Sequence, residues 1–251
     1  MAGVDLPSIV DLDRTKLEAT LVGYIKRGAW NKADVMLAVV REGRFAVKDY
    51  GAKSFFVRAA GWLQLAREAR AYEALAGLSG VPRLGRRIDR DAIAVEYVEG
   101  IRLPKFHKHR PLPHLAARLA DLLDLIHARG VIHNDIRSRD NILVTPAGRL
   151  FLIDFSSALR FGRSGFAKRF VMPIFEGAER RALLKWKSAI APGSMTEADH
   201  TAHRRFSRLR RFWPFNPKRD LPRSELDAEE RKDGGGRGSN RSRGSGRSED
   251  S

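Results

Sequence analysis

The sequence predicts an α+β fold in which a strand-rich first part precedes a helix-rich second part, with a ligand cleft between the two. Residues 34–50 contain two β-forming runs broken at Glu42-Gly43, which is the chemistry of a hairpin turn. The pattern changes to a helical period over 58–78, and residues 92–98 have the pattern of a short buried strand. A Leu-rich helix over 114–129 begins the second part.

The first expected helix carries an apolar face among arginines, and Gly80-Val81-Pro82 should end it. The residues of this face are Trp62, Leu63, Ala66, Ala69, Tyr72 and Leu75. In the second part, two short apolar runs at 141–145 and 150–155 are separated by a Pro-Ala-Gly-Arg turn. The expected order is therefore strand pair, helix, strands, helix, hairpin and further helices.

Composition excludes several classes of protein. Hydrophobic residues make up 43% of the 251 residues, which suffices for a sizeable buried core. There is no cysteine, so disulfides and thiolate metal sites are excluded and a reducing compartment is expected. The sequence has neither a membrane-spanning apolar run nor the pattern of a secretory signal. We therefore expect a cytoplasmic protein, with peripheral attachment to the inner face of the membrane as a further option.

The formal net charge of +17 is unevenly distributed. Residues 222–251 carry seven basic and seven acidic residues, and the glycine- and serine-rich end of this tail predicts disorder. Residues 204–221 carry seven basic residues and one acidic residue, which leaves +11 on residues 1–203. A basic folded body suits phosphate-bearing ligands or anionic membranes, although general solubility explains it equally well.

The segment from 131 to 155 contains the groups that phosphoryl transfer needs, namely oxygen ligands for Mg²⁺ and a group that orients the nucleophile. His133-Asn134-Asp135 follows the Leu-rich helix, Asn141 opens an apolar run, and Asp154-Phe155 ends the next run. The two runs would form one hairpin, with Asn141 at the start of the first run and Asp154 near the end of the second.

This segment resembles the catalytic loop and the metal-binding Asp-Phe-Gly element of protein kinases. Upstream, Phe45-Ala46-Val47-Lys48 is similar to the strand that carries the phosphate-binding lysine. Glu68 lies twenty residues later on a helix, where the family has the glutamate that pairs with this lysine. Val95 to Gly100 resembles the interlobe hinge. Each piece alone is common, but their shared order and spacing are specific.

The resemblance implies a bilobal protein-kinase-like fold with a β-rich N-lobe and a shortened helical C-lobe, which binds ATP and Mg²⁺. The site residues that it implies are Lys48, Glu68, Glu96 and Val98 for the nucleotide, Asn141 and Asp154 for the metal, and Asp135 and Arg137 for catalysis. Lys48 would hold the α- and β-phosphates, the hinge backbone would take the adenine edge, and Asp135 would orient the acceptor hydroxyl.

Some of these assignments keep an alternative. Glu73 is a rival of Glu68 on the same helix. Asp140 is a rival of Asn141, because it stands where the usual loop spacing puts the asparagine. Arg137 would neutralise the γ-phosphate, or is a surface charge.

His133 is expected to be structural, since the corresponding histidine of similar proteins packs beneath the metal-binding aspartate. Residues 204–213 place aromatic and aliphatic side chains on one side of a basic helix that Pro214 ends. Such a helix suits an anionic membrane surface, and packing on the large lobe is the alternative.

Several features depart from ordinary protein kinases. The residue after His133 is Asn134 in place of arginine, Ser156 replaces the glycine of Asp-Phe-Gly, and no Ala-Pro-Glu segment follows. The phosphate loop offers Gly23 and Gly28, with Lys26, Arg27 and Lys32 as partial substitutes. Together with residues 67–84 and 183–192, these departures resemble the bacterial RIO-like and lipopolysaccharide-core (Kdo/heptose) kinase-like proteins.

The sequence thus predicts an N-lobe over 1–98, a C-lobe over 99–221 and a tail over 222–251. The predicted function is an ATP-dependent kinase whose acceptor is a hydroxyl of a sugar, a lipid-linked glycan or a protein. One alternative is a pseudokinase or nucleotide-binding scaffold without turnover. Another is a basic protein that binds membranes or nucleic acid, but no nucleic-acid-binding module is recognised. The oligomeric state and the identity of the acceptor stay open.

Overall fold

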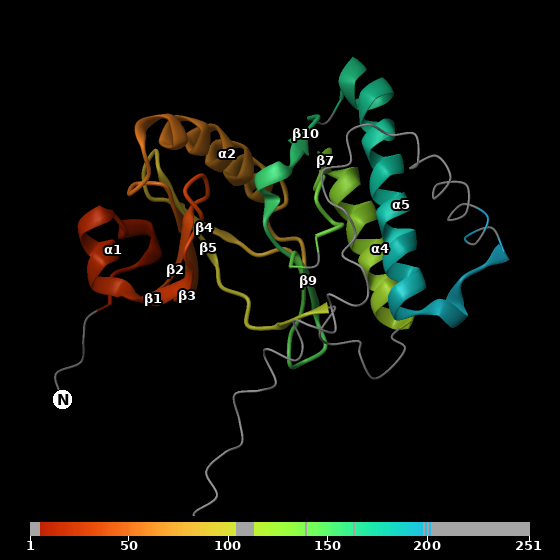
Figure 1. The fold of residues 1–251 in the computed structure, drawn as a ribbon, viewed down its shortest axis with the longest axis horizontal. Coiled ribbons are helices and arrows are strands. Elements are labelled where there is room, and N and C mark those ends of the chain that lie inside the picture. The colour runs from red at the N-terminus through yellow and green to blue at the C-terminus, as the bar shows by residue number, and fades with distance from the viewer. Residues whose placement is uncertain are drawn as a thin grey trace, which may run out of the picture. The chain divides into compact units, whose positions relative to one another are not determined.

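The fold is mixed α+β, with a five-stranded antiparallel sheet and several helices (Figure 1). Residues Met1–Phe206 form one unit of the chain and Ser207–Ser251 a second. The computed structural model describes residues 6–103, 113–138, 140–162, 164–197, 199 and 201, all of which belong to the first unit. The basic segment 204–213 and the tail 222–251 lie outside the described residues, and the predicted boundary at residue 98 stays a prediction.

The five-stranded sheet has the strand order β1-β2-β3-β5-β4. Its strands are β1 (Leu21–Lys26), β2 (Asp34–Val40), β3 (Gly43–Asp49), β4 (Leu84–Arg87) and β5 (Ala92–Glu96). The pairing of β2 with β3 runs from Asp34 opposite Asp49 to Val40 opposite Gly43, so the predicted hairpin is confirmed. β5 confirms the strand expected over 92–98, although it ends at Glu96.

The two faces of β3 have different neighbours. Phe45 and Val47 are buried in a cluster that also contains Leu12 and Leu17, from the segment with η1 (Ile9–Asp11) and α1 (Arg14–Thr20). Because side chains alternate along a strand, Lys48 faces the opposite side of the sheet from Val47. The hydrophobic alternation of β3 therefore decides the direction in which this lysine points.

Helix α2 (Phe55–Ala74) confirms the helix expected over 58–78, and it begins and ends earlier than predicted. The residues it buries are Gly61, Leu65, Ala66, Glu68, Ala69, Ala71 and Tyr72. The expected apolar face is buried only in part, because the side chains of Trp62 and Leu63 are exposed. The first turns of α2 have few covering neighbours, since Phe55 and Phe56 are exposed as well.

The rest of the described chain contains two long helices and short strands. Helix α4 (Pro113–Ala128), expected over 114–129, packs beside α5 (Met172–Ile190) (Figure 1). The strands are β6 (Ile101–Arg102), β7 (Val131–Ile132), β8 (Ile142–Val144), β9 (Leu150–Leu152) and β10 (Leu159–Arg160). β6, β8 and β9 form one small sheet, and β7 pairs with β10. The short helical turns are η3 (Phe155–Ser157), η4 (Ala167–Val171, a π-helix) and η5 (Pro192–Ser194).

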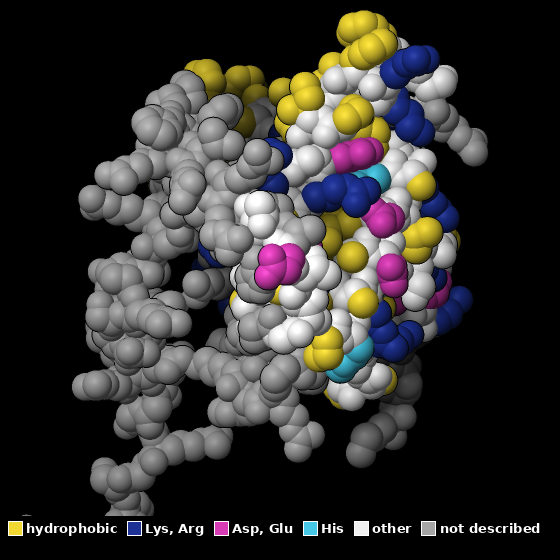
Figure 2. Space-filling model, turned by 90° about the vertical axis from the view of Figure 1, so that its right-hand side faces the viewer, with side chains coloured by type: hydrophobic (Ala, Val, Ile, Leu, Met, Phe, Trp, Pro, Cys, Tyr) yellow, Lys and Arg dark blue, Asp and Glu magenta, His cyan; other side chains and the backbone are white. Residues whose placement is uncertain are grey.

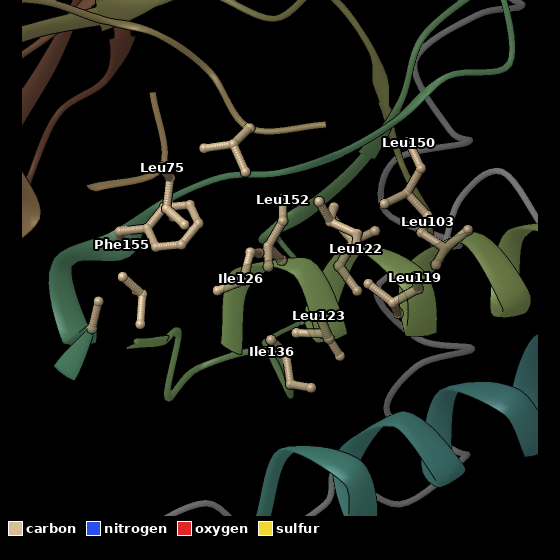
Figure 3. Packing of buried hydrophobic residues seen from close by; sticks show 14 of the residues in the cluster. Leu75, Leu103, Leu119, Leu122, Leu123, Ile126, Ile136, Leu150, Leu152 and Phe155 are labelled. Carbon is tan, nitrogen blue, oxygen red and sulfur yellow. The ribbon is translucent and has the colours of Figure 1, made fainter. Parts of the chain in front are cut away.

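A single hydrophobic cluster joins the sheet to these helices. Figure 3 shows Leu122 and Ile126 of α4 beside Leu152 of β9, and Leu119 of α4 beside Leu103. The same cluster includes buried residues of α2, β5 and α5. The sheet and the helical part are thus joined by continuous packing, which fixes the elements that carry the candidate site. No helix within the described ranges is both long and apolar enough to cross a bilayer.

Gly130 lies at the start of β7, where two backbone segments approach closely. Its φ is 74°, and a Cβ atom there would lie 2.1 Å from the carbonyl oxygen of Gly162. Gly148 has a similar φ of 71° but open space around its Cβ position.

We expect Gly148→Ala to lower the free energy of unfolding by about 1 kcal/mol, through the cost of the left-handed conformation. Gly130→Ala should lower it clearly more, because the two backbones must also separate. Urea unfolding of both variants measures the difference, and equal losses would contradict the close approach.

Candidate active site

One lysine connects three elements of the fold. Lys48 Nζ of β3 donates to Glu68 Oε1 of α2 at 2.6 Å and to Asp154 Oδ1 at 2.7 Å. Glu68 is fully buried, and Asp154 is the N-cap of η3, two residues after the end of β9. Three residues that are distant in sequence therefore meet through one ammonium group.

The sequence places these groups by simple local rules. In the β3–β5 pairing, Lys48 lies opposite Ile93, so its main chain is held in the middle of the sheet. Glu68 lies on the buried, alanine-rich side of α2, next to Ala69. Small side chains there allow α2 to approach the sheet closely, so that the carboxylate of Glu68 can reach Lys48. Glu73, the alternative partner, is exposed on the other side of α2.

The charges of this group depend on one another. Burial alone would lower the pKa of Lys48, but the carboxylates of Glu68 and Asp154 outweigh burial and raise it. Burial raises the pKa of Glu68, and the ammonium of Lys48 opposes that rise. For Asp154, the charge and hydrogen bond of Lys48 outweigh burial, so its pKa lies below the usual range. Lys48 is therefore a cation and Asp154 an anion at neutral pH.

A second pair lies at the start of β8. Asn141 Nδ2 donates to the carbonyl oxygen of Asp135 at 2.9 Å and to Asp135 Oδ2 at 3.1 Å. Because the amide nitrogen is committed to Asp135, the oxygen Oδ1 of Asn141 remains as its acceptor. Asp140, the rival of Asn141, is exposed and pairs with Arg102 at 3.1 Å.

The hairpin brings the two groups to one end. The backbone N–H of Ile153 donates to the carbonyl oxygen of Asn141 at 2.9 Å, and β8 and β9 pair directly after this bond. Asp154 is the next residue along the chain. Asn141 and Asp154 therefore stand side by side at the same end of the hairpin, as the sequence predicts.

His133 joins the loop to this hairpin. Its Nδ1 accepts the N–H of Asp135 at 3.2 Å, so Nε2 carries the proton that bonds the carbonyl oxygen of Ile153 at 3.0 Å. The imidazole is fully buried, and its ring packs against Phe155 with 4.6 Å between ring centroids. This geometry agrees with the structural role expected for His133.

Two residues of the site have left-handed backbone conformations. Asn134 and Asp154, with φ of 64° and 65°, are the non-glycine residues with positive φ in the described part of the chain. Asparagine and aspartate tolerate this region better than other L-residues do. Ser156, which follows in η3, does not have a positive φ, so a glycine is not needed there. Such outliers concentrate at functional sites.

Sequence reasoning missed a second anchor of the loop, Glu179 of α5. This carboxylate is buried, and its Oε1 accepts the N–H of Asn134 at 2.6 Å. Its Oε2 lies 2.6 Å from Nε2 of His127 in α4. Glu179 shares the buried face of α5 with Ala182 and Trp186, so an acidic residue at an apolar position of the helix could have indicated it.

The oxygen atoms fit a small hard cation. In the described residues, the hydrogen bonds of the Asp154 side chain use Oδ1, which leaves Oδ2 as a ligand. Asn141 Oδ1 could supply a second oxygen ligand, which is neutral beside the carboxylate of Asp154. Mg²⁺ takes few protein ligands and keeps waters and phosphate oxygens, so two suffice. Within the described ranges, no three His, Cys, Asp or Glu side chains gather as a ligand set for another metal.

The other predicted residues are less closely engaged. Arg137 is exposed and makes no ion pair or hydrogen bond among the described residues. Glu96 is bound to Arg83, whose N–H donates to its Oε2 at 3.0 Å. The N–H of Glu96 donates to the carbonyl oxygen of Arg83 at 2.8 Å. Val98 lies beyond the end of β5, and its backbone has no such partner in the described chain.

The loop between β1 and β2 is held by polar contacts within the protein. The N–H of Gly28 donates to Asp34 Oδ1 at 2.8 Å, and Lys53 pairs with the same oxygen at 3.1 Å. A Cβ atom on Gly28 would lie 2.3 Å from the carbonyl oxygen of Lys32, so only glycine fits. Gly23 has open space around it. The glycine amide of this loop is therefore already used within the protein.

Comparison with known proteins relates part of the chain to kinases. No protein-family model matches the chain. The serine/threonine-protein kinase PKH3 of Eremothecium gossypii is 39% identical over 51 residues, which are 20% of this chain and 7% of that protein. PKH3 of Saccharomyces cerevisiae is 42% identical over 45 residues, 18% of this chain and 5% of that protein. The match thus spans only a small part of these relatives, and it supports a kinase-like relation over that part alone.

Burial of His133 gives a testable pH dependence. Burial lowers the pKa of His133, so the unfolded chain binds this proton more readily than the folded protein does. Its contribution to stability is complete above about pH 6.5 and is lost as the pH falls toward the lower pKa of the folded state. The slope is at most about 1.4 kcal/mol per pH unit.

We expect His133→Gln, which keeps a donor and an acceptor, to flatten the stability profile between pH 5 and about 6.5. Urea unfolding of both proteins across this range provides the measurement. An NMR titration of His133 should place its pKa below the usual 6.5. Parallel stability profiles for the two proteins would contradict a buried neutral imidazole.

Proposed function

We propose that the chain is an ATP- and Mg²⁺-dependent phosphotransferase that acts on a hydroxyl acceptor. The observation that carries the proposal is the double contact of Lys48 with Glu68 and Asp154, at 2.6 and 2.7 Å. It joins a strand lysine, a helix glutamate and the aspartate after a hairpin, which is the arrangement that kinase-like phosphoryl transfer uses. The local similarity to serine/threonine-protein kinases supports the same class.

The charges of the site support this chemistry. Lys48 and Glu68 compensate each other, so Asp154 and Asp135 leave a net negative charge at the end of the hairpin. Mg²⁺ bound by Asn141 and Asp154 would neutralise charge on the phosphates. Lys48 would hold nonbridging phosphate oxygens from the opposite side, with its position set by the two carboxylates.

Asp135 would then orient the acceptor. The acceptor oxygen forms a bond to the γ-phosphorus, the bond from that phosphorus to the bridging oxygen breaks and releases ADP, and the hydroxyl proton passes to Asp135. The N–H of Asp135 is bound by His133, and its carbonyl oxygen and Oδ2 are bound by Asn141. Positioning and electrostatics would supply nearly all of the acceleration, as is usual for phosphoryl transfer.

At the level of the fold, we propose the bilobal kinase-like arrangement, with the sheet and α2 in the first lobe and α4, α5 and the hairpin in the second. Asn134, Ser156 and the glycine-poor loop favour the RIO-like or lipopolysaccharide-kinase-like branch. The acceptor in this proposal is a hydroxyl on a sugar, a lipid-linked glycan or a protein.

A second candidate function is a nucleotide-binding scaffold without turnover. The loop between β1 and β2 favours it, because the N–H of Gly28 is bound to Asp34 and is not free to hold a phosphate. The presence of Lys48, Asp135, Asn141 and Asp154 in one connected arrangement favours the enzyme.

Binding of Mg-ATP tests the nucleotide site. A ligand at about 100 times its Kd stabilises a protein by about 2.7 kcal/mol, which corresponds to a rise in Tm of at least about 5 °C for a domain of this size. Lys48→Met keeps the length of the side chain but removes the charge, and should abolish most of that rise. Lys187→Ala is the matched control, because it breaks a lysine–aspartate pair outside the candidate site, with Asp199 at 2.6 Å, and should keep the rise. An unchanged Tm of the wild-type protein at millimolar Mg-ATP would contradict both candidate functions.

The two aspartates should separate binding from turnover. Asp135→Asn should lower kcat by at least about 100-fold while Mg-ATP still raises the Tm, because this carboxylate acts on the acceptor. Asp154→Asn removes a metal ligand and should weaken both. Transfer of the label from γ-labelled ATP to fractionated cell envelope or protein, with ADP as the second product, measures turnover. Near-normal turnover of Asp135→Asn would show that the loop has been assigned wrongly.

A further inference from the structure

An apolar strip is exposed on the helical segment that leads into α5. Phe166, Phe170 and Ile174 follow at intervals of four residues, through η4 into the first turn of α5. Their side chains are 74%, 55% and 67% exposed, whereas Met172 on the opposite side is buried. Helical spacing therefore gathers three large hydrophobic side chains on one outward face.

The strip protrudes and is not the wall of a deep groove. The rings of Phe166 and Phe170 lie 4.7 Å apart between centroids, beside a shallow hollow of about 430 Å³ next to Lys168. Figure 2 shows hydrophobic side chains at the top of this face of the molecule, where Figure 1 places the start of α5, with basic side chains close to them. A protruding apolar strip suits a partner that needs no complementary shape.

The surroundings of the strip are basic. Between Asp154 and Glu176 the sequence has four basic residues and no acidic one. Lys168 and Arg169 stand between the aromatic side chains, and the guanidinium of Arg169 lies 5.6 Å from the centre of the Phe170 ring. Aromatic residues flanked by lysine and arginine match the level of lipid headgroups in an anionic membrane.

We propose that Phe166, Phe170 and Ile174, together with Lys168 and Arg169, form a docking surface for an anionic lipid membrane. The apolar side chains enter the headgroup region while the two cations contact lipid phosphates. This surface is distinct from the basic segment at 204–213, and the proposal does not depend on phosphotransfer. The same segment runs on from Asp154 through β10, which pairs with β7 just before His133. Docking would thus orient the loop of the candidate site relative to the lipid surface.

Vesicle binding by the full chain tests the proposal. Wild-type protein should bind vesicles of phosphatidylcholine with one quarter phosphatidylglycerol, and bind pure phosphatidylcholine weakly. Phe166→Ala with Phe170→Ala should reduce binding to the anionic vesicles about tenfold. Lys168→Gln with Arg169→Gln should reduce it about 25-fold, or about fivefold for each charge, and should lessen its sensitivity to salt.

The matched control is Phe55→Ala with Phe56→Ala. These two phenylalanines are also exposed and in edge contact, but they lie on α2. The control should bind anionic vesicles as the wild type does, and circular dichroism and the Tm should show that all three double variants are folded. Because all the proteins share residues 204–251, any binding by that segment is common to them. Wild-type binding by the Phe166/Phe170 variant would overturn the proposal. So would a change from dimer to monomer in that variant without a change in vesicle binding, since the strip would then contact a second copy of the chain.

Discussion

The ammonium group of Lys48 holds the elements of the candidate site together. It lies between a fully buried carboxylate on α2 and the aspartate that follows β9, within 2.7 Å of each. Without this cation, Glu68 would be an uncompensated buried charge, which costs several kcal/mol in a protein interior. The positions of α2, β3 and the hairpin are therefore coupled through one side chain. The second oxygen of Glu68, Oε2, is buried without a hydrogen-bond partner in the described chain, so the whole pairing rests on Oε1.

The His-Asn-Asp loop, residues 133–135, is held from two directions. His133 ties it to the hairpin through the carbonyl oxygen of Ile153, and Glu179 ties it to α5 through the N–H of Asn134. Trp186 of α5 adds a third bond, from its Nε1 to the carbonyl oxygen of Ile136 at 2.7 Å. A loop with a left-handed residue at its centre needs such support, because the conformation is not favourable by itself. The bonds hold Asp135 at a fixed place relative to Asn141.

The departures from the common kinase pattern have local physical reasons. Asn134 occupies a conformation with positive φ, which asparagine accepts more readily than arginine does. Ser156 lies in a 3-10 turn with an ordinary backbone, and it donates its N–H to the side chain of Asp154, the N-cap of that turn. Gly28 is required because its loop folds tightly on itself and on Asp34. Asn134 and Ser156 leave the connected site intact. The tight fold around Gly28 limits how the loop between β1 and β2 could hold a phosphate.

Sequence patterns alone determined the local elements of this protein. The hairpin over 34–50, the helices α2 and α4 and the strands on both sides of residues 146–149 follow from hydrophobic period and turn residues, which act over a few neighbours in the chain. The motif spacing also predicted that Asn141 and Asp154 share one end of a hairpin.

Tertiary structure decided what depends on distant neighbours. Trp62 and Leu63 have the helical spacing of buried residues but are exposed, because few described residues cover the first turns of α2. The choice of Glu68 over Glu73, and of Asn141 over Asp140, followed from which side chain faces the interior. The role of Glu179 as the anchor of Asn134 depends on the packing of α4 and α5. The periodicity of a single helix contains no information about a backbone donor that another segment brings to it.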